Sequence, residues 1–385
     1  MPMVDKDPTY STNHLSIAEA GETQRSGYRP RHGLSIPAVT VLDEHDRVIE
    51  DDQRRLFRYL IQESKGADII FGVGTTGEWN RIANGERQRL IWIETDEVAR
   101  INRSSPQKAL SVEAWVGVTS STRLETLDNL KCALDARADA AVIAPLSIVD
   151  LSDIISFFQR EVSDLFDHHG RCLPIFLYDN ADIAVNPRIP HIRTRDVKLL
   201  SRLPFISGIK VSASRRVLGN YTKGVAHFKD KGEFGIYVGN AMLIFQVFDL
   251  EHGLSGRIRE YWNRYLLHNE LPIGVVSGPA NAMPREWQRA WRACYAGDER
   301  LMSIYKTAFE RFDIACRSSK GTNAPEKIIA CVKHALKVDG VITSDRVANG
   351  TPALESDERR EFATNYEALR KDLALITDPI WTSSI

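Results

Sequence analysis

Lys210 ends a short apolar run, and an amine in that position can become a nucleophile. Phe205, Ile206 and Ile209 predict a buried strand that begins after Pro204. Burying an ammonium group is costly unless the group is paired or neutral. Desolvation lowers the pKa of a lysine, and the neutral amine attacks carbonyl groups. The alternative is that Lys210 reaches solvent at the strand end, so the choice depends on what the other strands carry.

Two other predicted strands end in groups that suit the same chemistry. One runs into Gly74–Glu78, where two glycines and two threonines let N–H and O–H donors converge on an anion such as a carboxylate. An ordinary tight turn has a similar composition. The other ends in Tyr178, Asp179 and Asn180, where a phenol can act as a general acid or base. A core tyrosine with a satisfied hydroxyl is the alternative there.

Together, these groups are what Schiff-base chemistry on a 2-oxo acid requires. Thr75 and Thr76 would hold the carboxylate, and Lys210 would attack the neighbouring ketone. Tyr178 would move protons as the carbinolamine loses water and an enamine forms. Because the protonated imine is the electron sink, we expect neither a metal nor a cofactor.

The chain alternates short apolar runs with helical patterns from residue 33 onward. The runs cover residues 33–41, 68–74, 110–116, 140–145, 173–178, 205–210, 234–239 and 272–277. This alternation predicts parallel βα units. Eight units without a glycine-rich dinucleotide fingerprint favour a closed (β/α)8 TIM barrel, an α/β fold, over an open sheet. In such a barrel the carboxyl ends of the strands meet at one face, which brings the three groups together.

The remaining segments flank or interrupt this barrel. Residues 1–32 are polar with little periodicity and predict an N-terminal extension that is partly disordered. The barrel is expected over residues 33–285, with an insertion at about 250–271 that predicts an extra helix. Residues 286–385 predict a C-terminal helical region packed outside the barrel.

Composition excludes several classes of partner. The formal net charge of -1 gives no electrostatic basis for binding nucleic acid or an anionic membrane. The five cysteines are scattered without a CxxC pair, which argues against a disulfide framework or zinc site and fits a reducing compartment. No apolar run approaches the roughly 18 residues of a membrane span, and no signal pattern is found at the N-terminus, so we predict a cytoplasmic protein.

The motifs resemble those of the dihydrodipicolinate synthase / N-acetylneuraminate lyase family of class I, pyruvate-type aldolases. Gly74–Glu78, followed by Glu86 and Arg87, resembles the family's GTTGE…ER signature. Tyr178–Asn180 stands in place of its YN element, and Gly208–Lys210 resembles its Schiff-base GIK element. Gly239 and the S-x-x-A-N-x-x-P pattern of Ser277–Pro284 complete the resemblance, which covers about residues 33–373.

The resemblance implies a TIM barrel with a C-terminal helical appendage, assembled as a homotetramer built from two dimers. It implies that Lys210 forms the imine and that Tyr178 transfers protons. It implies that Thr75 and Thr76 form the carboxylate-binding turn, with Thr76 also in a proton relay. Substrate contacts are expected from the turn and from the end of the seventh strand: Thr75, Thr76, Gly77, Gly239 and Asn240.

Several positions depart from the family pattern. Ile183 stands where the synthases carry an arginine that binds a second carboxylate, and Leu146 and Ser147 replace the strand-four aromatics that include a relay tyrosine. Asp179 replaces the usual asparagine, and Val211 replaces a common acidic residue. These changes retain imine chemistry but argue against the lysine-biosynthetic substrate.

We therefore predict an acceptor aldehyde that is apolar, aromatic or polyhydroxylated, and Trp79 either lines its pocket or packs in the core. The predicted function is a Schiff-base lyase or aldolase acting on pyruvate or a related 2-oxo acid together with an aldehyde. A dehydratase of a sugar-derived 2-oxo acid is one alternative, because an enamine can also expel hydroxide. A non-catalytic barrel that binds a 2-oxo acid is the other.

Overall fold

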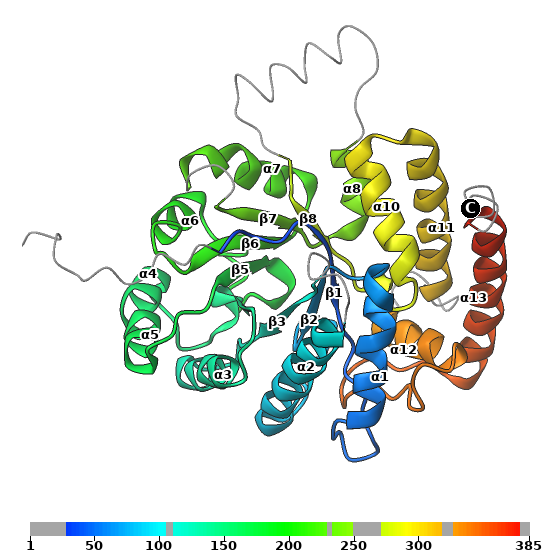
Figure 1. Cartoon of the computed structure of the whole chain (residues 1–385), viewed down its shortest axis with the longest axis horizontal. Helices are drawn as coiled ribbons and strands as arrows, with labels where there is room; N and C mark the ends of the chain where they lie inside the picture. The colour runs from blue at the N-terminus through cyan, green and yellow to red at the C-terminus, as the bar shows by residue number, and fades with distance from the viewer. Residues whose placement is uncertain (1–27, 105–110, 229–232, 249–270, 318–325, 378–385) are drawn as a thin grey trace, which may run out of the picture.

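Eight parallel strands close into a barrel in the order β1 to β8, as Figure 1 shows. The computed structural model describes residues 28–104, 111–228, 233–248, 271–317 and 326–377. The helix predicted at about 250–271 and most of the N-terminal extension lie outside the described residues. The predicted TIM barrel is confirmed.

The strands are β1 (Gly33–Pro37), β2 (Ile69–Gly72), β3 (Glu113–Gly117), β4 (Ala140–Ile143), β5 (Ile175–Asn180), β6 (Ile206–Ser212), β7 (Gly235–Val238) and β8 (Gly274–Val276). The outer helices are α1 (Glu50–Ile61), α2 (Asn84–Ser104), α3 (Arg123–Asp135), α4 (Ile154–Ser156), α5 (Ser163–His169), α6 (Thr194–Leu200), α7 (Arg215–Gly224) and α8 (Ile244–Val247). A π-helical segment, Phe157–Val162, joins α4 to α5. The C-terminal helices are α10 (Pro284–Ala296), α11 (Glu299–Cys316), α12 (Ile328–Val338) and α13 (Ser356–Thr377).

Aromatic rings fill the middle of the barrel. The Trp115 ring stacks on Phe176 with centroids 3.8 Å apart, and the Tyr237 ring meets both edge-on at 5.0 and 5.4 Å. All three side chains are buried. Side chains alternate between the two faces of a strand, so Phe176 and Tyr178 point to the same interior. These rings therefore form a packed aromatic layer below the carboxyl ends of the strands.

Residues just before β1 contact the amino-terminal end of the barrel. The Tyr28 hydroxyl donates to Oε2 of Glu113 at 2.8 Å, and the Tyr237 hydroxyl donates to the Arg31 carbonyl. Burial raises the pKa of the Glu113 carboxyl. The last part of the predicted 1–32 extension thus packs against the barrel.

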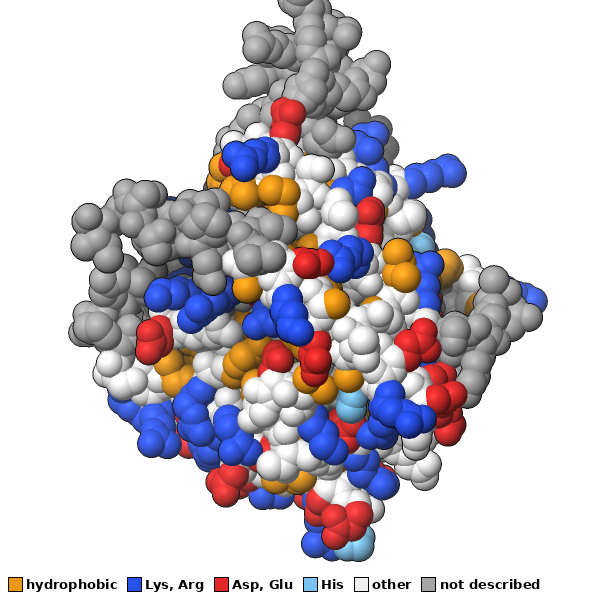
Figure 2. Space-filling model, turned by 90° about the vertical axis from the view of Figure 1, so that its right-hand side faces the viewer, with side chains coloured by type: hydrophobic (Ala, Val, Ile, Leu, Met, Phe, Trp, Pro, Cys, Tyr) orange, Lys and Arg blue, Asp and Glu red, His pale blue; other side chains and the backbone are white. Residues whose placement is uncertain are grey.

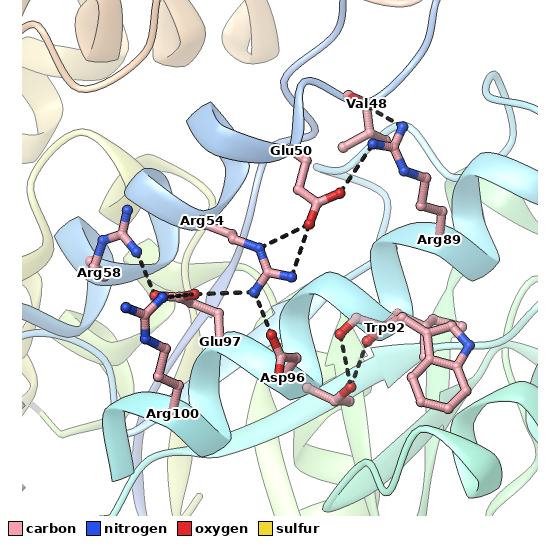
Figure 3. Close-up of polar contacts among 11 residues, drawn as sticks. Val48, Glu50, Arg54, Arg58, Arg89, Trp92, Asp96, Glu97 and Arg100 are labelled. Carbon is pink, nitrogen blue, oxygen red and sulfur yellow. Dashed lines mark hydrogen bonds and ion pairs between the residues drawn. The ribbon is translucent and has the colours of Figure 1, made fainter. Parts of the chain in front are cut away.

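An ion-pair network joins α1 to α2 on the outside of the barrel (Figure 3). The buried Glu97 carboxylate receives Arg58 at 2.6 Å, Arg54 at 3.2 Å and Arg100 at 3.9 Å. Arg54 also contacts Glu50 at 2.9 Å. A buried carboxylate is tolerated only with such partners, so the network fixes the spacing of these two helices.

The C-terminal helices α10 to α13 lie on one side of the barrel (Figure 1). Trp287 of α10 stacks on Phe309 of α11 at 3.9 Å, and Tyr366 of α13 donates to the Ala282 carbonyl at 3.1 Å. α10 begins at Pro284, so the boundary predicted at residue 285 falls within its first turn.

The face in Figure 2 carries cationic and anionic side chains interspersed. Within the described part of the chain, no helix is both long and apolar enough to span a bilayer.

Candidate active site

Lys210 lies inside the barrel on β6, where only 6% of its surface is exposed. Its strand neighbour on β5 is Tyr178, and Nζ lies 3.8 Å from the centre of the Tyr178 ring. The Phe71 ring of β2 lies 4.9 Å from the same nitrogen. The solvent-exposed alternative for Lys210 is therefore excluded.

The surroundings of Lys210 favour a neutral amine. Burial lowers the pKa of Lys210, and Tyr178 opposes this effect only in part. Aromatic ring faces attract an ammonium but do not replace its hydration shell. The amine is therefore deprotonated at a lower pH than a solvated lysine.

The Tyr178 phenol has three polar partners. Nδ2 of Asn180 donates to its oxygen at 3.0 Å, and Oγ of Ser212 donates at 3.3 Å. Oγ1 of Thr75 lies 3.3 Å from the same oxygen, and either hydroxyl can donate in this pair. Burial acts to raise the pKa of Tyr178, but the Lys210 ammonium and the hydrogen bonds from Ser212 and Thr75 outweigh it and lower the pKa.

The turn after β2 presents donors beside this phenol. Among the described residues, no acceptor is recorded for the backbone N–H groups of Thr75, Thr76 or Gly77. The Gly77 carbonyl instead accepts from Oγ1 of Thr40 at 2.7 Å. A side chain added at Gly278 would lie 3.2 Å from Oγ1 of Thr76, so the turn packs closely against the segment after β8. Successive backbone N–H groups without protein acceptors can bind an anion.

At the end of β7, Gly239 leaves room for a neighbouring side chain. The Gly239 N–H donates to the Val211 carbonyl at 2.7 Å, and a Cβ atom at Gly239 would lie 2.1 Å from Oγ of Ser212. Glycine is therefore required for Ser212 to reach Tyr178. The Asn240 side chain is exposed, and no hydrogen bond joins it to another described residue. The structure thus brings Lys210, Tyr178 and Thr75 together. Gly239 lies next to Ser212, which bonds Tyr178, whereas the exposed Asn240 side chain forms no hydrogen bond with these residues.

No protein-family model matches the chain. The chain is 25% identical over 308 residues to an uncharacterised DapA-like lyase of Thermococcus kodakarensis, covering 80% of this chain and 89% of that protein. It is 33% identical over 111 residues to the 4-hydroxy-tetrahydrodipicolinate synthase of Methanothermobacter thermautotrophicus. That match covers 29% of this chain and spans about a third, 35%, of the synthase.

Solved structures share the whole fold. A dihydrodipicolinate synthase from Bacteroides thetaiotaomicron superposes with a TM-score of 0.68 at 21% identity, covering 89% of this chain and 99% of that one. A catalytic lysine mutant of the Ruminococcus gnavus sialic acid aldolase gives 0.67 at 15% identity, covering 89% and 97%. YagE of E. coli K12, a dihydrodipicolinic acid synthase family protein solved with pyruvate, gives 0.66 at 18% identity, covering 88% and 98%.

The chain is therefore similar to a DapA-like lyase over most of its length, and it shares its fold with a dihydrodipicolinate synthase and a sialic acid aldolase. Proteins of these kinds make up the dihydrodipicolinate synthase / N-acetylneuraminate lyase family. The resemblance of its motifs to this family is confirmed.

Asp179, which replaces the asparagine of the family's YN element, has a structural role in this chain. Asp179 is fully buried and accepts hydrogen bonds from the Ile192 N–H and the Tyr221 hydroxyl, both at 3.0 Å. His191 lies 3.0 Å from the same carboxyl, whose pKa burial raises. These partners lie outside the barrel, whereas Asn180 is the residue that contacts the Tyr178 phenol.

Ile183 and Trp79 pack against different parts of the core. Ile183 packs against the interior cluster that includes Tyr178, so an aliphatic side chain lies where the synthases have an arginine. Trp79 is 9% exposed and belongs to the outer core, with the Arg87 guanidinium 5.9 Å from its ring. Trp79 therefore packs in the core, and its pocket-lining interpretation is not supported.

Glu78, the last residue of the turn, is bound by residues of the C-terminal region. Its carboxylate forms a buried ion pair with Lys333 of α12 and accepts from the Ala348 N–H at 2.7 Å. Nζ of Lys333 also donates to the Arg346 carbonyl at 2.8 Å. Glu78 has a φ of 58°, a backbone conformation that a non-glycine residue adopts only under constraint. The turn that carries Thr75 and Thr76 is therefore tied to α12 through Glu78.

Sequence reasoning missed Lys333, Asn180 and Ser212. Asn180 and Ser212 each follow an interior strand residue by two positions, so strand alternation could have found them. Lys333 lies within the apolar stripe of α12 and is fully buried, but its partner is 255 residues away in the chain. Only the tertiary structure reveals that pairing.

We predict that Lys333→Met lowers the free energy of unfolding by about 3–5 kcal/mol, because it leaves the Glu78 carboxylate buried without its cation. The measurement is urea unfolding. Lys337→Met on the same helix is the control: Lys337 is half-exposed and its partner Asp345 keeps the Arg359 guanidinium, so the loss should be about 0–1 kcal/mol. In the double variant Glu78→Gln/Lys333→Met the loss should be smaller than the sum of the single losses. Additive losses would contradict the pairing.

We also predict that Lys210→Met raises the pKa of Tyr178, because it removes the ammonium that stabilises the phenolate. Ultraviolet difference spectra against a Tyr178→Phe variant isolate this one phenol during a pH titration. Ionisation should begin at a lower pH in the parent protein than in Lys210→Met. Superimposable titration curves would show that the amine and the phenol do not interact.

Proposed function

We propose that this protein is a lyase or aldolase that forms an imine between Lys210 and pyruvate or a related 2-oxo acid. The observation that supports this most strongly is the buried amine 3.8 Å from the Tyr178 ring, beside a turn with unbonded N–H groups. A desolvated amine, an anion-binding turn and a phenol are three parts of one reaction. We further propose a cytoplasmic homotetramer, as the motif resemblance implies.

The first half of the reaction is the formation of the imine. The carboxylate of the 2-oxo acid binds the N–H groups of Thr75, Thr76 and Gly77, which directs the ketone carbon toward Lys210. The neutral amine attacks this carbon, and a proton passes from nitrogen to oxygen to give a carbinolamine. The Tyr178 phenol then protonates the hydroxyl, which leaves as water, and the iminium remains. General acid catalysis of this kind contributes roughly 10²–10⁴-fold in rate.

The second half proceeds through the enamine. In the cleavage direction, the C4 hydroxyl loses its proton and becomes the carbonyl of the leaving aldehyde as the C3–C4 bond breaks, and the electron pair of that bond forms the enamine. In the synthetic direction, the enamine carbon attacks an acceptor aldehyde. The hydrogen-bonded pair of Tyr178 and Thr75, 3.3 Å apart, supplies a route for the proton that each direction requires. Hydrolysis of the remaining imine restores the lysine.

The acceptor side of the site favours an aldehyde without a second carboxylate. Ile183 lies against the interior cluster and has no charge with which to bind a distal anion. Leu146, which follows β4, is also uncharged, and its partly buried side chain packs against the outer core. An unpaired carboxylate near such side chains would lose hydration without a compensating ion pair. We therefore propose an apolar, aromatic or polyhydroxylated acceptor.

The imine is tested by borohydride reduction in the presence of pyruvate, followed by mass analysis of peptides. We expect a stable adduct on Lys210 that is lost in Lys210→Ala and retained in Lys223→Ala, which removes an exposed lysine of α7. Because the pKa of Lys210 is lowered, the labelling rate should rise with pH and level off below the ordinary lysine pKa of about 10.4. No adduct at any pH from neutral to mildly alkaline would refute the proposal.

The acceptor is tested with two aldehydes of similar length, butyraldehyde and succinic semialdehyde, by following pyruvate consumption. The parent protein should prefer butyraldehyde. Ile183→Arg should shift the ratio of kcat/KM values toward succinic semialdehyde by roughly ten-fold or more, because it supplies a cation for the distal carboxylate. Ile183→Leu is the size control and should leave the ratio unchanged. An equal ratio in the arginine variant would exclude Ile183 as a determinant of the acceptor.

A further inference from the structure

A second cavity lies outside the barrel, between α1, α2, α10 and α13. It has a volume of about 760 Å³, and no residue of the imine site lines it. Four of its lining residues are arginines and two are carboxylates: Arg58, Arg285, Arg289, Arg370, Glu63 and Glu286. The formal charge of this lining is therefore +2. The excess is notable because the whole chain has a formal net charge of -1.

Two of the four arginines are already engaged. Arg58 donates to Glu97 of α2 at 2.6 Å, as Figure 3 shows, and Arg370 donates to Glu286 at 3.0 Å. These pairs hold the cavity wall in place. They also leave most donors of each guanidinium unused, since an arginine has five N–H groups.

The other two arginines lie one turn apart on α10. Among the ion pairs between described residues, Arg285 and Arg289 take part in none, and Arg289 interacts with the Tyr305 hydroxyl. Residues at i and i+4 share one face of a helix, so both guanidinium groups reach the same space. They are the cations that an incoming anion would meet without first displacing a protein carboxylate.

Two features of the backbone and the apolar wall define the ligand further. α10 begins at Pro284, and its first residues lack intrahelical partners for their N–H groups, which favours negative charge at this end of the cavity. The lining also includes apolar side chains, those of Tyr59, Ile61, Ile101 and Ala374. The Tyr59 hydroxyl donates to the Ala282 carbonyl at 3.2 Å, which anchors that ring. An inorganic ion would leave this apolar wall unused.

We propose that this cavity binds a small organic polyanion, with its negative groups on Arg285 and Arg289 and its carbon skeleton against Tyr59 and Ile61. The negative groups are carboxylates or phosphates, both of which pair bidentately with arginine. This site is separate from the imine site and does not depend on the proposed reaction.

Isothermal titration calorimetry of the full chain tests the site at fixed ionic strength, with excess pyruvate present to occupy any carboxylate site in the barrel. The probes are citrate and inorganic pyrophosphate. We expect one molecule of at least one probe to bind per chain. Arg285→Gln/Arg289→Gln should weaken that binding at least ten-fold. Citrate alone would indicate a polycarboxylate ligand, and pyrophosphate alone would indicate a phosphorylated one.

Arg292→Gln is the matched control, because Arg292 is an exposed arginine of the same helix that does not line the cavity. It should bind the probe as the parent does. Thermal melts establish that each variant folds, and the single variant Arg285→Gln replaces the double variant if the latter does not. Failure of both probes to bind the parent protein would overturn the proposal. Binding by the folded double variant within two-fold of the parent would also overturn it.

Discussion

The burial of one ammonium-forming side chain is the constraint on which the site depends. Lys210 is 6% exposed, and its nitrogen faces two aromatic rings instead of a carboxylate. A paired carboxylate would keep the amine protonated, whereas this environment favours the neutral form. Beneath it, the rings of Trp115 and Phe176 stack in the barrel interior. The same packing that stabilises the barrel therefore keeps Lys210 away from bulk water, with the Tyr178 phenol as its strand neighbour.

The C-terminal helices take part in shaping this site even though they lie outside the barrel. The turn that carries Thr75 and Thr76 ends at Glu78, whose carboxylate is buried with Lys333 of α12. On the other side of the turn, Gly278 lies against Thr76, and Asn281 bonds the backbone at both Val39 and Pro37. Removing either partner of a buried ion pair is destabilising, so we expect the turn to lose its conformation when α12 unfolds. The conformation of this turn is therefore coupled to the C-terminal region as well as to the barrel.

The sequence predicted the parts of the structure that depend on local pattern. Apolar runs alternating with amphipathic helices were sufficient for the barrel, and strand-end positions identified Lys210, Tyr178 and the threonine turn. Three kinds of feature could not be predicted from the sequence. Asn180 contacts the Tyr178 phenol whereas Asp179 points to the outer helices, and only the strand face decides which of them meets the phenol. Trp79 proved to be a core residue. Lys333 and the arginine-lined cavity depend on contacts between segments that are hundreds of residues apart.

The central claim is that one bound 2-oxo acid engages the amine, the phenol and the turn at once. A crystal structure of the protein soaked with pyruvate tests this most directly. The account predicts continuous electron density from Nζ of Lys210 to the second carbon of pyruvate, with the carboxylate on the N–H groups of Thr75, Thr76 and Gly77 and the Tyr178 hydroxyl next to the new bond. Pyruvate held by another lysine, or its carboxylate held away from the threonine turn, would contradict the account.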